Sequence, residues 1–309
     1  MTVGQERKGT HPIAVTGRRR SWLLGVPLLI AVGGYLGAIA YMRANETAFV
    51  FHPDQYGGRT MVAPIAELPA EAVRIRSSDS LDLSAWVIPP AAGADSAPFW
   101  VLFMHGNAAN FSVPARQAWA RALRAQGVGL VMFDYRGYGA SADGPLHEAG
   151  LYRDARSVYD WMQRERGIEA DRIILFGHSL GTGVATELAT TVEAAGLVLE
   201  GAFTSIPDVG AGRYPWLPVR WLARERFASE ARADSIAMPK LILHAKDDAA
   251  VPFALGQRLF AAMPAPKEFV TLTGGHDRAF ATDSATYFGA IAAWLDALRV
   301  TDRESPPPG

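Results

Sequence analysis

Short apolar runs alternate along most of the chain with longer stretches in which apolar residues recur at helical spacing. The runs predict β-strands near 73–76, 83–88, 99–104, 128–133, 172–176, 197–199, 241–243 and 269–272. The longer stretches predict helices near 114–125, 148–166, 182–190, 253–262 and 281–298. Such alternation requires a mostly parallel sheet with helices on both faces, so the predicted fold class is α/β.

The amino-terminal part differs from the rest, because no charged residue occurs from Ser21 to Met42. A stretch of about 22 residues suffices to cross a bilayer as a helix. Basic residues, among them the run at 18–20, are denser before this stretch than after it. We therefore expect a cytoplasmic tail at 1–20, a transmembrane anchor at 21–42, one domain at 46–299 on the outer (periplasmic or extracytoplasmic) side, and a disordered tail at 300–309.

Two other interpretations of the apolar stretch remain open. Ala38-Ile39-Ala40 resembles a signal-peptidase site, and Arg19-Arg20 resembles part of a twin-arginine export signal, so the chain would be secreted after cleavage. Alternatively, the stretch is a buried core helix.

Composition narrows the possible functions. The chain has 309 residues with 30 basic and 31 acidic side chains, and this balance gives no reason to expect a nucleic-acid partner. It contains no cysteine, which excludes disulfides, thiolate metal sites and a cysteine nucleophile. Neither a phosphate-binding glycine-rich loop nor metal-ligand spacing occurs in the sequence, so we expect no metal and no cofactor.

The clearest chemical motif is Gly177-His178-Ser179-Leu180-Gly181, which joins an apolar strand to a helix of small residues. A serine at such a tight turn projects its hydroxyl above the sheet beside the amides of the helix N-terminus. Ser179 is therefore the candidate nucleophile.

A serine nucleophile needs a base, and the base needs an acid that orients it. Of the two histidines after Ser179, His276 follows the last predicted strand in a glycine-bearing loop, whereas His244 ends an apolar strand. Catalytic groups in such sheets come from loops at the carboxyl ends of strands, so His276 is the predicted base. Asp247 and Asp248 both end the preceding strand, and propensity does not separate them as the acid.

Acyl transfer also needs donors that face the developing oxyanion. The amide of Leu180, directly after the nucleophile, is one candidate. The amide of Asn107, in the loop after the strand at 99–104, is the other, and His105 is expected to brace that loop by hydrogen bonds. Asp134 and Arg136, after the next strand, are expected to brace another wall of the site.

One long insertion, about 207–239, separates two predicted strands and is rich in proline and aromatic residues. Long connections of this kind are usually lids or binding loops. Tyr214, Trp216 and Leu217 are the candidate substrate-binding residues, although a lid that packs on the core explains the same pattern.

Five motifs, in order, resemble those of the serine α/β-hydrolases: His105-Gly106-Asn107, 133–139, 177–181, His244 to Pro252, and Gly275-His276. The chain is most similar to the membrane-anchored branch with a His-Gly-Asn oxyanion loop, which includes lysophospholipid lipases, monoacylglycerol lipases and protein depalmitoylases. Phe49-Val50-Phe51-His52-Pro53 also fits this branch. The resemblance implies the α/β-hydrolase fold with a short lid, and the spacing of Asp248 to Val251-Pro252 implies that Asp248 is the acid.

The leading hypothesis is therefore a serine esterase or lipase that forms an acyl-enzyme on Ser179, with a small-molecule or lipid acyl ester as substrate and the membrane as partner. One alternative is an amidase or peptidase with the same triad. Another is a catalytically inactive, membrane-tethered binding protein, which is disfavoured because no triad residue is missing.

Overall fold

The computed structural model describes residues 1, 9, 18–93 and 97–304, so most of the expected tail at 1–20 lies outside the described residues. The chain divides into two units, Met1–Ala44 and Asn45–Gly309. In the first, helix α1 (Arg18–Ala44) contains one stretch, Gly25–Ala44, that is long and apolar enough to cross a membrane. Signal sequences have the same property.

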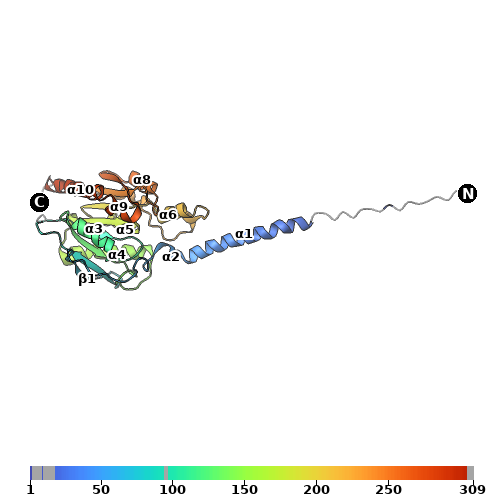
Figure 1. The fold of residues 1–309 in the computed structure, drawn as a ribbon, viewed down its shortest axis with the longest axis horizontal. Helices are drawn as coiled ribbons and strands as arrows, with labels where there is room; N and C mark the ends of the chain where they lie inside the picture. The colour runs from blue at the N-terminus through green and yellow to red at the C-terminus, as the bar shows by residue number, and fades with distance from the viewer. Residues whose placement is uncertain (2–8, 10–17, 94–96, 305–309) are drawn as a thin grey trace. The chain divides into compact units, whose positions relative to one another are not determined.

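An eight-stranded sheet forms the centre of the second unit, with the strand order β1-β2-β4-β3-β5-β6-β7-β8 (Figure 1). β2 pairs antiparallel with β1 and β4, and the other neighbours pair parallel. This confirms the predicted mostly parallel sheet. The strands are β1 (Glu71–Arg76), β2 (Asp82–Ile88), β3 (Trp100–Met104), β4 (Gly129–Phe133), β5 (Ile173–His178), β6 (Gly196–Glu200), β7 (Lys240–Ala245) and β8 (Lys267–Leu272).

Helices connect the strands and cover both faces of the sheet. They are α2 (Glu46–Val50), α3 (Pro114–Arg124), α4 (Glu148–Arg166), α5 (Leu180–Ala189), α6 (Ile206–Arg213), α7 (Val219–Leu222), α8 (Phe253–Ala262), α9 (Gly275–Thr282) and α10 (Ser284–Glu304). Short 3₁₀ helices occur at Ala170–Arg172 and Glu230–Ser235.

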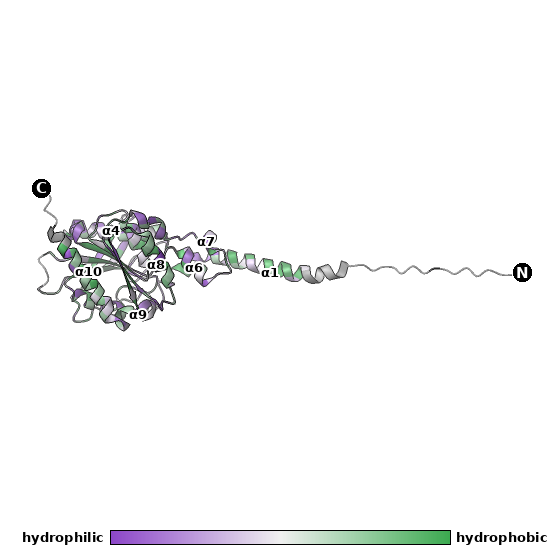
Figure 2. Ribbon diagram, turned by 90° about the horizontal axis from the view of Figure 1, so that it is seen from above, coloured by the Kyte–Doolittle hydropathy of each residue, from purple (hydrophilic) through white to green (hydrophobic). Residues whose placement is uncertain are grey.

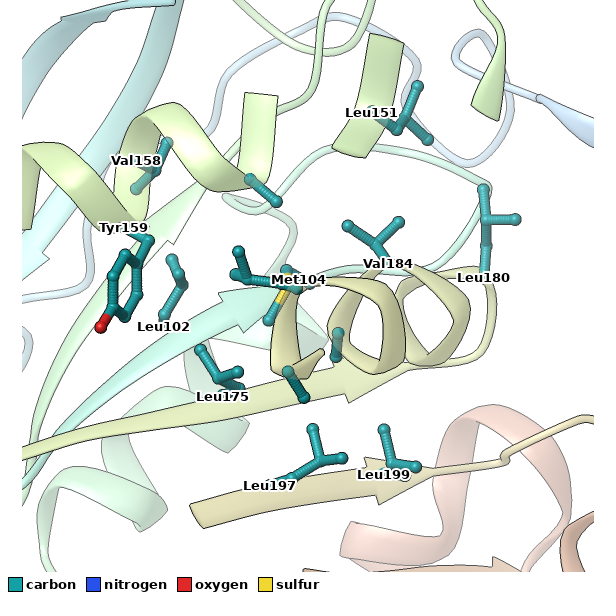
Figure 3. Close-up of a cluster of buried hydrophobic side chains, with 14 of the residues drawn as sticks. Leu102, Met104, Leu151, Val158, Tyr159, Leu175, Leu180, Val184, Leu197 and Leu199 are labelled. Atoms are coloured by element: carbon teal, nitrogen blue, oxygen red, sulfur yellow. The ribbon is translucent and has the colours of Figure 1, made fainter. Parts of the chain in front are cut away.

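Successive strand residues point to opposite faces, so the apolar strands divide the core into two layers. On one face Leu175 and Leu197 pack with residues of α4, α5 and α8 (Figure 3). On the other face Phe103 and Phe176 pack with α3, α9 and α10, and the Trp119 ring lies 4.9 Å from that of Phe176. The strands between these layers are largely hydrophobic (Figure 2).

The carboxyl-terminal region differs from the expected single helix at 281–298. A separate helix, α9, begins at Gly275, because Gly274 and Gly275 take positive φ angles of 108° and 71° and turn the chain directly out of β8. α10 also extends to Glu304, into the expected tail, since no proline or glycine interrupts 300–304. Residues 305–309 of that tail lie outside the described residues.

Candidate active site

Ser179 lies at the junction between β5 and α5 in a strained conformation, with φ 52° and ψ −120°. Its amide donates a hydrogen bond to the carbonyl of Glu200 at 2.9 Å. A Cβ at Gly177 would approach the Gly181 carbonyl oxygen to 2.4 Å, and one at Gly181 would approach the Met104 carbonyl oxygen to 1.9 Å. The two glycines therefore permit the close approach of strand, helix and neighbouring loop that the turn requires.

The structure brings Ser179 together with both other predicted catalytic residues. His276 Nε2 lies 2.7 Å from Ser179 Oγ, and His276 Nδ1 lies 2.7 Å from Asp248 Oδ2. The three side chains come from the end of β5, the first turn of α9 and the loop after β7. When Asp248 is ionised, Nδ1 donates to it and Nε2 accepts from the Ser179 hydroxyl.

Asp247 and Asp248 have different surroundings, although they are adjacent in the sequence. The Asp248 side chain is 1% exposed, and its Oδ1 accepts from the amides of Ala250 and Val251 at 2.8 Å each. Asp247 is exposed and accepts instead from the amide of Gly274 at 3.1 Å. Asp248 therefore contacts the imidazole, whereas Asp247 holds the start of the segment that carries His276.

The electrostatic environment favours an ionised Asp248 and a readily protonated His276. Burial opposes the charge of Asp248, but hydrogen bonds from His244 and His276 outweigh it and hold the pKa of Asp248 below its usual value. Burial also opposes a charged His276, but the hydrogen bond and charge of Asp248 outweigh this effect and raise the pKa of His276. The arrangement stabilises an imidazolium.

The two predicted oxyanion donors flank Ser179. A Cβ at Gly106, next to Asn107, would lie 3.2 Å from Ser179 Cβ, so this loop passes beside the serine. Within the described part of the chain, the amides of Asn107 and Leu180 have no hydrogen-bond acceptor. Both are thus available to a ligand, and their role stays a prediction.

Residues 50–52, at the end of α2 and just beyond it, hold the loop that carries Asn107. The Asn107 carbonyl accepts from the His52 amide at 2.8 Å and from the Tyr138 hydroxyl at 2.9 Å, and the Asn107 side chain donates to the Val50 carbonyl at 3.2 Å. The motif at 49–53 is the sequence signal for this support, and the contacts of His52 and Val50 with Asn107 span more than fifty residues of chain.

Several buried polar side chains brace the same loops. His105 is fully buried, with Nδ1 at 2.7 Å from the Gly106 carbonyl oxygen and Nε2 at 3.3 Å from Asp134. The Arg136 guanidinium binds Asp154 at 2.7 Å and Asp79 at 2.8 Å. These contacts are the bracing expected for His105, Asp134 and Arg136.

The insertion forms α6, α7 and a 3₁₀ helix before β7 begins at Lys240. Leu217 is buried at 5% exposure, Tyr214 is half-buried, and Trp216 is 58% exposed. The three predicted substrate-binding residues thus have different environments, and their contact with substrate stays a prediction.

Two titratable groups near the serine, one buried and one partly buried, were missed by sequence reasoning. Glu200 ends β6, and its Oε2 accepts from the Tyr287 hydroxyl at 2.7 Å, while Tyr287 accepts from Trp119 Nε1 at 2.9 Å. Burial raises the pKa of Glu200 to about 7, although the Tyr287 bond favours the carboxylate. Burial and the charge of His276 lower the pKa of His178 to about 3, so His178 is neutral at physiological pH.

We expect Glu200→Gln to shift the pH dependence of hydrolysis. Ionised Glu200 is one of the negative charges that raise the pKa of His276, and that charge develops as pH rises through about 7. Glutamine removes the charge, so the pKa of His276 falls and the acid limb of kcat/KM moves to lower pH. Glu165→Gln, an exposed change at the far end of α4, should leave the limb in place. An unmoved or upward-shifted limb in Glu200→Gln contradicts the prediction.

One group of potential metal ligands occurs among the described residues. Donor atoms of His178, His276 and Asp277 lie within 4.8 Å of one another. His276 Nε2 already contacts Ser179, so a metal ion here would compete with the serine for the imidazole.

Known proteins share this fold and these motifs. The sequence profile of the alpha/beta hydrolase family matches residues 101–305, more than half of the chain. The chain belongs to the alpha/beta hydrolase family. This hydrolase is 35% identical over 266 residues to an uncharacterized protein of Mycobacterium tuberculosis, Rv2307c, and the alignment covers 85% of this chain and 92% of that protein.

One similar sequence is that of a lipase, and one similar fold is that of an esterase. It is 36% identical over 178 residues to the lysophosphatidylserine lipase ABHD12 of Danio rerio, with 52% of this chain and 46% of ABHD12 aligned. The match therefore spans less than half of that lipase. The Pyrococcus furiosus esterase Pf2001 has the same fold, with a TM-score of 0.66 at 18% identity over 80% of this chain and 99% of the esterase.

Proposed function

We propose that this hydrolase cleaves carboxylic esters with lipid-like acyl chains through an acyl-enzyme on Ser179. The observation that carries the proposal is the chain of two 2.7 Å contacts from Ser179 through His276 to Asp248. The lipase among its sequence relatives supports ester chemistry.

In the first half of the reaction, Ser179 Oγ attacks the ester carbonyl carbon and its proton passes to His276 Nε2. Asp248 stabilises the imidazolium, and the amides of Asn107 and Leu180 bind the oxyanion of the tetrahedral intermediate. His276 then gives the proton to the leaving alkoxide, the ester C–O bond breaks, and the alcohol departs from the acyl-enzyme.

In the second half, water attacks the acyl carbon and gives a proton to His276 Nε2. Collapse of the intermediate returns that proton to Ser179 Oγ and releases the carboxylic acid. The reaction consumes one water per ester, and His276 accepts and donates the proton in every transfer.

We further propose that the stretch at 21–42 anchors the protein in a membrane, with the amino terminus in the cytoplasm and the hydrolase domain on the outer side. The length and composition of Gly25–Ala44 support the anchor, and the arginines at 18–20 support the orientation. An anchored enzyme with an aromatic lid is suited to substrates that reside in the bilayer.

A p-nitrophenyl ester series from acetyl to palmitoyl, hydrolysed by the full-length chain in one detergent, tests the substrate class. We expect kcat/KM to rise by about tenfold or more from acetyl to an optimum at eight carbons or longer, because each buried methylene contributes about 0.8 kcal/mol. A steady fall beyond a few carbons would show a small-ester esterase. Hydrolysis of the matching anilides with little ester activity would favour the amidase alternative.

A further inference from the structure

The tip of the lid carries two exposed tryptophans. Trp216 is 58% exposed and Trp221 is 89% exposed. The backbone that carries them is fixed by two features. Leu217, which lies between them in the sequence, is buried, and the Leu222 amide donates to the Pro218 carbonyl at 3.2 Å. Large indole rings that are exposed to solvent in this way are typical of a surface that binds a membrane or another protein.

The end of the lid is bound to the first residues after α1. Glu46 Oε1 accepts from the amides of Arg224 and Glu225, at 2.6 and 2.9 Å. Only Asn45 separates Glu46 from Ala44, the last residue of α1. Trp221 precedes Arg224 by three residues, a reach of about 11 Å at most. These two hydrogen bonds and the short span of chain keep Trp221 close to Asn45, the residue that follows α1.

The charge of the lid suits an anionic lipid surface. Between Ser205 and Phe227 the chain carries four arginines but only two acidic residues, Asp208 and Glu225. Asp208 is neutralised by Arg220 at 2.7 Å and Arg258 at 3.2 Å. Arg224 and Arg226 are exposed, and basic residues near a membrane attract anionic head groups.

We propose that residues 214–226 form a second membrane contact, in which Trp216 and Trp221 lie at the head-group level of the bilayer that α1 crosses. Tryptophan prefers this level because its ring is apolar and its N–H is polar. The inference rests on the proposed anchor. It assigns Trp216 to the lipid surface rather than to the bound ester.

The contact would also place the bilayer next to the catalytic machinery. Phe227, in the same insertion, is buried and packs against Phe51 with 6.2 Å between ring centroids. Phe51 lies between Val50 and His52, which hold the Asn107 loop. The segment after the anchor therefore supports both the lid and the predicted oxyanion donor, so an ester in the bilayer would have a short path to Ser179.

Because the chain contains no cysteine, a single introduced cysteine can be labelled specifically, which allows a direct test. Trp221→Cys in the full-length chain is labelled with an environment-sensitive nitrobenzoxadiazole dye and reconstituted in vesicles of phosphatidylcholine and phosphatidylglycerol. Nitroxide lipids then report the depth of the dye. The matched control is Glu165→Cys, exposed on α4 about 25 Å along the helix from Glu148, whose amide donates to Glu225.

We expect shallow nitroxide lipids to quench the dye at position 221 at least twofold more than the dye at position 165. Equal, weak quenching at both positions in protein that floats with the vesicles would overturn the lid contact and leave the anchor intact. Protein that does not float would overturn both. This readout needs no catalysis, so fluorophosphonate labelling of Ser179 reports separately on the proposed function.

Discussion

Replacement of Ser179 by alanine is expected to lower kcat for ester hydrolysis by about 10⁶-fold. The Ser179 hydroxyl lies 2.7 Å from His276 Nε2, the predicted base. Among the described residues, no other nucleophilic side chain contacts this nitrogen, so no other group is placed to attack the ester. Initial rates with p-nitrophenyl octanoate on purified full-length protein give the measurement.

The control for this change is Ser235→Ala, in an exposed 3₁₀ helix, which should retain full activity. Thermal unfolding of both variants should match that of the original chain, because Ser179 is held by its backbone rather than by its hydroxyl. Loss of less than about tenfold in Ser179→Ala would mean that another residue attacks the ester.

The second large effect is expected at Asp248. Asp248→Asn keeps the side-chain shape but removes the charge that holds the proton on His276 Nδ1 and stabilises the imidazolium, and we expect kcat to fall by about 10⁴-fold. Asp247→Asn is the matched control, because an asparagine carbonyl still accepts from the Gly274 amide, and its kcat should change by less than about tenfold.

These two variants separate neighbours that propensity does not distinguish. Equal losses in both, or the larger loss in Asp247→Asn, would reassign the acid. The pH dependence gives a second readout: in Asp248→Asn the pKa of His276 falls, because the residue whose hydrogen bond and charge raise it has lost its negative charge. The acid limb of kcat/KM should therefore move to lower pH.

The fold was predictable because its signals are local. Apolar runs of strand length predict the strands, and the glycines around Ser179 predict the turn, without information about distant residues. The carboxyl ends of parallel strands meet at one edge, and for this reason the sequence predicts that Ser179 and His276 lie together with Asp247 or Asp248. The resemblance to the serine α/β-hydrolases then selects Asp248.

What the sequence could not supply depends on side-chain direction and long-range pairing. Asp247 and Asp248 have the same propensity, and only the turn after β7 decides that Asp248 points inward. Glu200 looks like any polar residue at the end of a strand, and its importance arises from burial beside Tyr287. The start of α9 at Gly275 depends on two positive φ angles that glycine permits but does not require.

The central claim is that Ser179 becomes acylated. The most direct test is to treat the full-length protein with a fluorophosphonate and to locate the adduct by peptide mass spectrometry. We predict a single adduct on the peptide that contains Ser179, lost in Ser179→Ala and slowed strongly in Asp248→Asn. An adduct on a different residue, or none with active ester hydrolysis, would contradict the proposed mechanism.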